Sequence, residues 1–286
     1  MSLAACTSAQ GGPAPFVARP FLKWAGGKKQ LLSQILPLLP KRYGRYIEPF
    51  VGGGAVFFAL APKRALLADV NRDLIDTYRA LQRQVDGVIA GLSSLTNDAE
   101  TFYCLRAMAP RALSLPARAA RFVYMNRTCY NGLYRVNQTG QFNVPFGRYR
   151  RPTICDADNL RAVAKRLGPA QLATQSFEAT LAQARPGDLV YLDPPYVPLS
   201  NTARFVQYAR GGFDMARQRQ LAGWCRRLAD AGVHVALSNA DTQAVRELYR
   251  GFHIVSVRAR RAINCKPALR GHVAEVLVLS SPSGRH

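Results

Sequence analysis

The chain has 286 residues, of which 48% are hydrophobic, enough for one large α/β domain with an inserted module or for two small domains. Its 39 lysines and arginines outnumber 17 aspartates and glutamates, and the net charge of +22 favours a polyanionic partner. The six cysteines form no Cys-x-x-Cys pair, the four histidines have no metal-ligand spacing, and no apolar stretch is long enough to cross a membrane. We therefore expect a cytoplasmic protein with reduced thiols, no bound metal and no membrane partner.

The first part of the chain, residues 1–19, is rich in Gly, Pro, Ala and Ser and predicts a flexible tail. The folded part is expected to begin with Pro20-Phe-Leu-Lys-Trp-Ala-Gly-Gly-Lys-Lys-Gln30, followed by an apolar helix over 31–39. The Gly-Gly-Lys run in this stretch is not a P-loop. Leu22 stands where the first glycine belongs, and Lys29 where a serine or threonine would bind magnesium.

A strand, a glycine turn and the start of a helix are predicted for Tyr46-Ile-Glu-Pro-Phe-Val-Gly-Gly-Gly-Ala-Val-Phe-Phe58. The glycines let a ligand approach the backbone, although the dinucleotide fingerprint is incomplete because Phe57 replaces its third glycine. A second predicted strand, 65–68, ends in Asp69. An acid at that distance after the first strand can accept hydrogen bonds from both hydroxyls of a ribose.

The segment 72–155 has a different character, because it begins helical and ends in a predicted hairpin with arms at 133–136 and 142–144. Between Glu100 and Asp156 there is no acid, while nine arginines accumulate: Arg106, Arg111, Arg118, Arg121, Arg127, Arg135, Arg148, Arg150 and Arg151. Arginine interleaved with tyrosine and asparagine suits contacts to phosphate or guanine, so we interpret the segment as an inserted nucleic-acid recognition module. The alternative is a compositional bias from a GC-rich genome.

After the insertion the alternation of strands and helices resumes, with strands predicted at 172–177, 188–192, 234–238, 252–258 and 273–279. The strand 188–192 runs into Asp193-Pro-Pro-Tyr196, and it must stop at Asp193 because prolines carry no amide donor. In open parallel sheets, ligands bind beyond the carboxyl ends of the strands, which makes Asp193 a site candidate. The alternative is an ordinary loop with a solvated aspartate.

Five motifs occur in a fixed order: Phe21-Leu-Lys-Trp-Ala-Gly-Gly-Lys28, Glu48-Pro-Phe-Val-Gly-Gly-Gly54, Asn131-Gly-Leu-Tyr-Arg135, Phe142-Asn-Val-Pro-Phe-Gly-Arg-Tyr149 and Asp193-Pro-Pro-Tyr196. In this order they resemble the D12-class DNA adenine methyltransferases, particularly the GATC-modifying enzymes of the Asp-Pro-Pro-Tyr type, over nearly all of residues 20–279. The resemblance implies a class I S-adenosylmethionine-dependent methyltransferase, with a Rossmann-like α/β fold and a mostly parallel seven-stranded sheet whose last strand is antiparallel. It also implies a catalytic domain of residues 20–71 and 156–286, interrupted by a mainly helical DNA-recognition domain, 72–155, that carries the β-hairpin.

The activity implied by the resemblance is methyl transfer from S-adenosylmethionine to the 6-amino group of adenine in double-stranded GATC. An exocyclic aromatic amine is a poor nucleophile, because its lone pair is delocalised into the ring. Asp193 and the backbone carbonyl of Pro194 would accept its two hydrogen bonds, and Tyr196 would stack on an adenine flipped out of the duplex. Direct in-line transfer of this kind needs no covalent intermediate.

The residues that the resemblance assigns to S-adenosylmethionine are Trp24, Gly26, Lys28, Phe50, Asp69, Phe177 and Asp193. Trp24 and Lys28 would contact it directly, Phe50 and the glycine loop would line its pocket, and Asp69 would bind its ribose. The alternative for Trp24 and Phe177 is packing in the core. The alternative for Lys28 is a solvated position at the start of a helix.

The residues that the resemblance assigns to DNA are Tyr130, Asn131, Leu133, Arg135, Pro145 and Arg148. Arg135 would read guanine through its two major-groove acceptors. Leu133 and Pro145 would contact the thymine methyl group, and Tyr130 would enter the stack where adenine leaves. The alternative for Arg135 is a contact to phosphate.

Other functions remain open at this point: methylation of another DNA site, of the cytosine 4-amino group or of protein glutamine, or a catalytically silent DNA-binding regulator. Double-stranded DNA is the expected partner, a cognate restriction endonuclease is a further partner that the family allows, and a nucleoid-associated monomer is expected. The stretch Arg261-Ala-Ile-Asn-Cys-Lys-Pro-Ala-Leu-Arg-Gly271 departs from the family pattern, and the sequence assigns no role to its part from Asn264 to Gly271.

Overall fold

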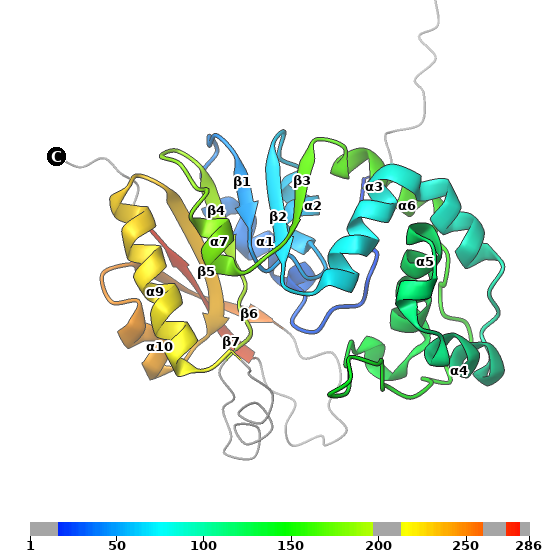
Figure 1. Cartoon of the computed structure of the whole chain (residues 1–286). Helices are drawn as coiled ribbons and strands as arrows, with labels where there is room; N and C mark the ends of the chain where they lie inside the picture. Colours follow the sequence, from blue (N-terminus) through cyan, green and yellow to red (C-terminus); the bar gives the residue numbers. More distant parts are fainter. Residues whose placement is uncertain (1–16, 197–212, 260–272, 281–286) are drawn as a thin grey trace, which may run out of the picture.

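The computed structural model describes residues 17–196, 213–259 and 273–280. In these ranges one sheet of seven strands has the order β3-β2-β1-β4-β5-β7-β6 (Figure 1). The strands are β1 (Tyr46–Glu48), β2 (Ala65–Asp69), β3 (Ala170–Thr174), β4 (Leu189–Leu192), β5 (His234–Ala240), β6 (His253–Ala259) and β7 (Val273–Leu279). β7 pairs antiparallel with β5 and β6, whereas the pairings among β1 to β5 are parallel. The predicted fold class, a mostly parallel seven-stranded sheet with an antiparallel last strand, is confirmed.

The observed strands follow the predicted ones, and the largest difference is in β3. It begins at Ala170 and ends at Thr174, so Phe177 is not a strand residue but begins helix α7 (Phe177–Leu181). The Ser176 side chain accepts a hydrogen bond from the Ala179 amide at 3.3 Å, which caps this helix. The cap therefore ends the extended run earlier than the apolar pattern suggests.

The helix predicted over 31–39 is broken into three short pieces. They are η1 (Lys28–Leu31), α1 (Leu32–Ile35) and η2 (Leu36–Leu38), of which η1 and η2 are 3₁₀ turns. Pro37 lacks the amide donor that would continue the α-helical ladder, so the chain tightens there and ends in a 3₁₀ turn. The apolar pattern located the segment correctly but not its helix type.

Alternating residues of the central strands build two cores on opposite faces of the sheet. Tyr46, Leu67 and Tyr191 point to a core shared with α2 (Ala55–Leu60) and with the helices of residues 72–167. Ile47 and Val190 point the other way, to a core shared with α7, α9 (Met215–Asp230) and α10 (Gln243–Leu248). Figure 1 shows α7, α9 and α10 on one face of the sheet. Because both faces are covered, the strands read as nearly continuous apolar runs.

The segment predicted as an insertion is mainly helical and lies beside the β3 side of the sheet in Figure 1. Its helices are α3 (Arg72–Ser93), α4 (Ala99–Ala107), η3 (Pro110–Ala112), α5 (Leu115–Thr128) and η4 (Tyr130–Gly132), and α6 (Ala157–Leu167) follows. Gly91 lets α3 approach α5 closely, because a Cβ atom there would stand 2.9 Å from the Ala120 Cβ. The hairpin forms around the bridge between Val136 and Phe142. The domain boundaries at 72 and 155 stay a prediction.

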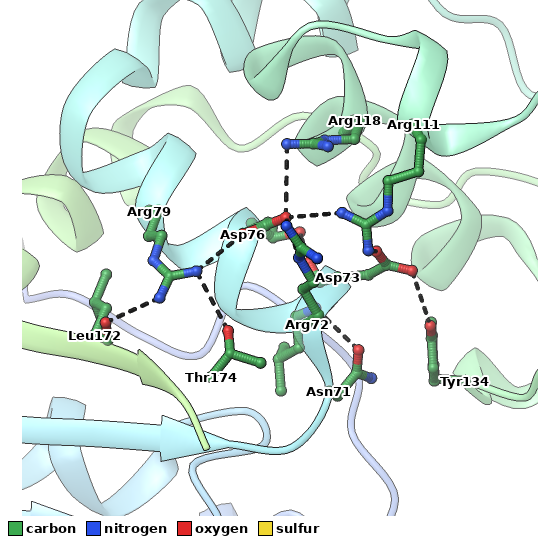
Figure 2. Close-up of polar contacts among 12 residues, drawn as sticks. Asn71, Arg72, Asp73, Asp76, Arg79, Arg111, Arg118, Tyr134, Leu172 and Thr174 are labelled. Atoms are coloured by element: carbon green, nitrogen blue, oxygen red, sulfur yellow. Dashed lines mark hydrogen bonds and ion pairs between the residues drawn. The ribbon is translucent and has the colours of Figure 1, made fainter. Parts of the chain in front are cut away.

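A polar cluster connects this helical segment to the sheet (Figure 2). Asp76, on α3, is 8% exposed, and its carboxylate lies 3.0 to 3.5 Å from the guanidinium groups of Arg79, Arg111 and Arg118. Arg79 also donates to the Leu172 carbonyl of β3 at 3.1 Å. A single buried carboxylate therefore joins α3, η3, α5 and the edge of the sheet. We call this group the Asp76 cluster.

Candidate active site

A cavity of about 660 Å³ opens at the carboxyl ends of β1, β2 and β4. The strand order reverses between β1 and β4, and the crevice at such a reversal is where open α/β sheets bind ligands. All seven residues assigned to S-adenosylmethionine by resemblance line this one cavity, namely Trp24, Gly26, Lys28, Phe50, Asp69, Phe177 and Asp193. The residues come from five separate stretches of sequence, and the parallel sheet brings them to a common edge.

The glycine loop after β1 forms the floor of the cavity. Gly52 and Gly54 have φ angles of 46° and 66°, which lie in the left-handed region that glycine adopts without strain. A Cβ atom on Gly52 would stand 2.6 Å from the Trp24 Nε1 atom, so only glycine lets this loop approach the indole. Trp24 lines the cavity and stacks on Tyr134 of the hairpin, with ring centroids 6.1 Å apart.

Asp69 ends β2 and places its carboxylate at the cavity wall. It accepts hydrogen bonds from the Asn71 amide at 2.9 Å and from the Gly52 amide at 3.3 Å. Burial raises the pKa of Asp69, and these backbone amides oppose the shift. The carboxylate is thus fixed in place beside the glycine loop, where its remaining lone pairs can accept hydrogen bonds from a diol.

Three phenylalanine rings form an apolar wall of the same cavity. Phe50, Phe177 and Phe213 lie with their centroids 5.6 to 5.7 Å apart in each pair. Phe177 is 4% exposed, so it packs in the core and lines the cavity at once. Sequence reasoning missed Phe213, just before α9, and Arg217, in the first turn of α9, which also line the cavity here. A planar heterocycle would fit against such a wall.

Lys28 and Asp193 form an ion pair in the cavity wall, with Lys28 buried and Asp193 21% exposed. The Lys28 side chain is 3% exposed, and its Nζ atom lies 2.8 Å from Asp193 Oδ1 and donates to the Gly26 carbonyl at 2.7 Å. Burial raises the pKa of Asp193 to about 6, and the Lys28 ammonium opposes that shift. Neither residue occupies the solvated position that the sequence left open as an alternative. Pro194 and Tyr196 follow in the cavity wall.

Two further acids at this edge received no role from the sequence. Glu48 is the last residue of β1; it accepts a hydrogen bond from the Tyr46 hydroxyl at 2.9 Å, and burial raises its pKa well above the usual range. Glu275 lies on β7 and accepts a hydrogen bond from the Tyr196 hydroxyl at 2.7 Å. The available signal for Glu275 was a single acid in the apolar run Val273-Ala-Glu-Val-Leu-Val-Leu279.

The residues assigned to DNA gather on the hairpin and the turn before it. Tyr130 and Leu133 are 53% and 39% exposed, which is high for side chains of this size and polarity. Between the two arms, Arg135 Nε donates to Asn143 Oδ1 at 2.8 Å. Next to the arms, the Tyr130 amide donates to the Pro145 carbonyl at 2.9 Å, and the two hydrogen bonds together fix the hairpin. Asn131 and Arg148 both have positive φ angles, 55° and 53°.

Six of the nine arginines in the acid-free stretch bind the protein's own groups. Their partners are Asp73 and Asp76, the Asn143 side chain or backbone carbonyls of residues 21, 105, 106, 143 and 144, and the arginines are Arg106, Arg111, Arg118, Arg121, Arg127 and Arg135. The exposed arginines are Arg111 and the four later ones, Arg135, Arg148, Arg150 and Arg151. The count of arginines therefore overstated the number available to a polyanion.

Some expectations are not tested by these residues. Among the described residues no group of His, Cys, Asp and Glu side chains could hold a metal ion. No helix in the described ranges is long and apolar enough to cross a membrane. The stretch 264–271 and most of the predicted tail lie outside the described residues, although Arg19 is described and its amide donates to Asn159 Oδ1 at 2.9 Å.

Comparison with known proteins agrees with this geometry. A family model described as D12 class N6 adenine-specific DNA methyltransferase matches residues 24–263. The Type II methyltransferase M1.LlaDCHI of Lactococcus lactis subsp. cremoris is 40% identical over 91% of this chain and 94% of its own length. The Type II methyltransferase M.MjaIII of Methanocaldococcus jannaschii is 40% identical over 92% and 99%. The DNA adenine methylase of Escherichia coli K12 is 39% identical over 92% and 96%.

Proposed function

The chain belongs to the D12 class of N6 adenine-specific DNA methyltransferases, and from this premise we propose that it methylates the 6-amino group of adenine in double-stranded GATC. One observation carries the proposal of mechanism. Asp193 and Pro194 stand at the wall of a cavity at the switch point of the sheet, where Lys28 forms an ion pair with Asp193 and Tyr196 lines the same cavity. This arrangement can hold a planar base and polarise its amino group.

Asp193 and the Pro194 carbonyl are two acceptors for the two hydrogens of one amino group. Accepting both hydrogen bonds draws the nitrogen toward a pyramidal geometry, which makes its lone pair more nucleophilic. The ion pair with Lys28 keeps the Asp193 carboxylate ionised above its pKa of about 6 and therefore able to accept. Because the Asp193 side chain is largely buried in the cavity wall, the adenine must leave the duplex to reach it, so base flipping is part of the proposal.

S-adenosylmethionine, when bound, supplies an electrophilic methyl group on a sulfonium. The cavity fits such a molecule in size, since small-molecule pockets span roughly 300 to 1,000 Å³. Asp69 would hold the ribose hydroxyls, Phe50 and Phe177 would contact the heterocycle, and the glycine loop would approach the nucleoside closely. Trp24 and Lys28 close the same cavity from the N-terminal stretch.

Asp69→Ala tests this placement of the methyl donor. The substitution removes the acceptor for two buried hydroxyls, so we expect S-adenosylmethionine to bind more weakly by about 1 to 3 kcal/mol in calorimetry. Glu247→Ala, an exposed acid on α10, serves as the control and should leave the affinity unchanged. An unchanged affinity of Asp69→Ala would move the ribose to another part of the cavity.

The GATC target rests on the hairpin, whose motifs resemble those of the GATC-modifying enzymes. In the proposed complex Arg135 reads guanine, Leu133 and Pro145 contact the thymine methyl group, and the exposed Tyr130 enters the stack left by adenine. Asn131 and Arg148 sit in the two turns that flank these side chains. Two of the relatives named above are called Type II methyltransferases, and on that ground a cognate restriction endonuclease is a proposed partner.

Expression in a host without GATC methylation tests the proposed function directly. Plasmid from cells making the wild-type protein should become resistant to an endonuclease blocked by adenine methylation in GATC. Plasmid from cells making the Asp193→Ala variant should stay sensitive. If wild type leaves GATC sites sensitive while mass spectrometry detects N6-methyladenine in the plasmid, the target is a different sequence.

A further inference from the structure

Glu275 belongs to the same side-chain cluster as Asp193, although it comes from the last strand of the sheet. β7 runs antiparallel to β5, so the beginning of β7 lies at the edge where the parallel strands end. Glu275 is the third residue of β7 and pairs with Ala240, the last residue of β5. This topology explains how an acid far along the chain reaches a site built from Lys28 and Asp193.

Glu275 contacts both the aromatic and the basic member of the cluster. It is 9% exposed, and its Oε2 atom accepts a hydrogen bond from the Tyr196 hydroxyl at 2.7 Å. The same oxygen lies 3.7 Å from Lys28 Nζ. Lys28 Nζ also stands 4.9 Å from the centroid of the Tyr196 ring. The ring is thus held at its hydroxyl by Glu275 and at its face by Lys28, and two such contacts fix its plane.

We propose that Glu275 is a positioning residue for methyl transfer, which holds the Tyr196 ring through its hydroxyl and shares the Lys28 ammonium with Asp193. The inference rests on the proposed function, in which Tyr196 stacks on the extruded adenine and Asp193 binds its amino group. Glu275 itself does not touch the base in this arrangement. Its effect reaches the reaction through the orientation of the ring and through the charge beside Asp193.

The charge on Glu275 acts on Asp193 in a defined direction. Burial raises the pKa of Asp193 to about 6, Lys28 lowers it, Glu275 raises it further and the hydrogen bond from Tyr196 lowers it. Removing the charge of Glu275 therefore lowers the pKa of Asp193. In the described residues the titratable groups that face Asp193 are Lys28 on η1, Glu48 on β1, Tyr191 on β4, Tyr196 and Glu275.

Glu275→Gln tests the charge while keeping an oxygen that can accept from Tyr196. Methyl transfer requires ionised Asp193, so the wild-type rate should fall on the acid side of pH 6. In Glu275→Gln that fall should move to lower pH by about half a unit or more, with the KM for DNA within about twofold of wild type. Asp241→Asn is the control, because it removes another acid at this sheet edge. The Asp241 amide donates a hydrogen bond to the Ala274 carbonyl of β7, and its carboxylate forms an ion pair with Arg246. Its pH profile should match wild type. An unmoved profile in Glu275→Gln overturns the shared-charge part of the proposal.

A double-mutant cycle tests the hydrogen bond. Tyr196→Phe keeps the ring and removes the donor, whereas Glu275→Ala removes the acceptor and the charge. Each should lower kcat, by about tenfold or more for Glu275→Ala, because a displaced ring misplaces the base. If Glu275 acts through the hydroxyl, the double variant should be no more than about twofold slower than Glu275→Ala. Rate losses that multiply would contradict the positioning role, as would wild-type kcat in Glu275→Ala.

These experiments give different results for an enzyme without the proposed function and for an enzyme in which Glu275 has no role. If wild type transfers no methyl group to any DNA, the proposed function fails. If wild type methylates DNA and the Glu275 variants share its kcat and its pH profile, only the role of Glu275 fails. Thermal melting of Glu275→Gln should match wild type, because the replacement has the same shape and keeps the hydrogen bond to Tyr196.

Discussion

The cavity and the arginine-rich segment use charge in opposite ways. In the cavity a single ammonium, Lys28, lies between the carboxylates of Asp193 and Glu275, and all three are largely buried. In residues 101–155 nine arginines occur without an acid, and six of them bind the protein's own carbonyl, carboxylate or amide oxygens. In the cavity, each of the few buried charges changes the pKa or the position of its neighbours. In residues 101–155, the number of arginines alone does not say how many of them can bind DNA.

The same contrast applies to two aspartates, Asp193 in the cavity and Asp76 on α3, which binds two of these arginines. Asp193 has one ammonium partner and a raised pKa of about 6, which suits a group that must exchange partners during a reaction. Asp76 has three arginines within 3.5 Å and connects four elements of the fold. The Asp193 carboxylate lines a cavity that a ligand can enter, whereas the Asp76 carboxylate is surrounded by arginines of the protein itself. We expect substitutions at the two to separate activity from stability.

The largest expected effect is that of Asp193→Ala on methyl transfer. Removing the acceptor for the amino group should lower the rate at least about 10² to 10³-fold. DNA affinity should stay within a few-fold of wild type, because the carboxylate acts on the extruded base and not on phosphate. A tritium-transfer assay and a DNA titration measure the two quantities. A rate within tenfold of wild type would show that Asp193 has no catalytic role.

Asp76→Ala should affect stability more than chemistry. The substitution leaves Arg79, Arg111 and Arg118 close together without their shared carboxylate, and we expect it to lower the free energy of unfolding by about 2 to 3 kcal/mol. The expected cost stays below that of a fully buried pair, since Arg111 is 49% exposed.

Asp86→Ala is the matched control for Asp76→Ala in urea denaturation. Asp86 lies on the same helix, is 79% exposed and pairs only with Arg161 among the described residues, so its loss should cost less than about 1 kcal/mol. If the two variants are equally stable, the Asp76 cluster contributes no more than a surface ion pair.

The smallest effect in rate, and the sharpest in selectivity, is expected for Arg135→Ala. Losing a bidentate guanine contact should reduce discrimination at the first base of the site by about 1 to 3 kcal/mol. Arg150→Ala, an exposed arginine outside the hairpin arms, should instead weaken binding to all sequences alike. The kcat/KM ratio between GATC and sites altered at the first base decides between them. Equal selectivity in Arg135→Ala and wild type would assign Arg135 to phosphate.

The parts of the site that could be predicted are those that follow strand ends within one local motif. Asp69 and Asp193 were identified because each terminates an apolar run, and an acid at the carboxyl end of a parallel strand has a defined place in space. Trp24 and Lys28 required the resemblance, because nothing in their spacing says that the N-terminal stretch folds over the glycine loop.

Glu275 and Phe213 could not be found in this way, because their positions depend on contacts between distant parts of the chain. Glu275 reaches the site only because β7 enters the sheet antiparallel between β5 and β6. Phe213 joins Phe50 and Phe177 across two other elements. The arginines show a different limit of sequence analysis. Composition gives their number, but it does not reveal that Arg121 and Arg127 donate to backbone carbonyls of the protein itself.

The place of β7 also sets the order in which the protein can become active. This strand is the last of the sheet in sequence, yet it lies inside the sheet, with β5 on one side and β6 on the other. During synthesis β5 and β6 are made first, but they cannot pair through β7 until that strand has been made. Pairing of segments far apart in sequence is also slow compared with local helix formation. Until β7 inserts, the Tyr196 hydroxyl lacks Glu275 as an acceptor and Lys28 pairs with one carboxylate instead of two. With Glu275 in its proposed role, a nascent chain stays catalytically incomplete until β7 has been made and folded.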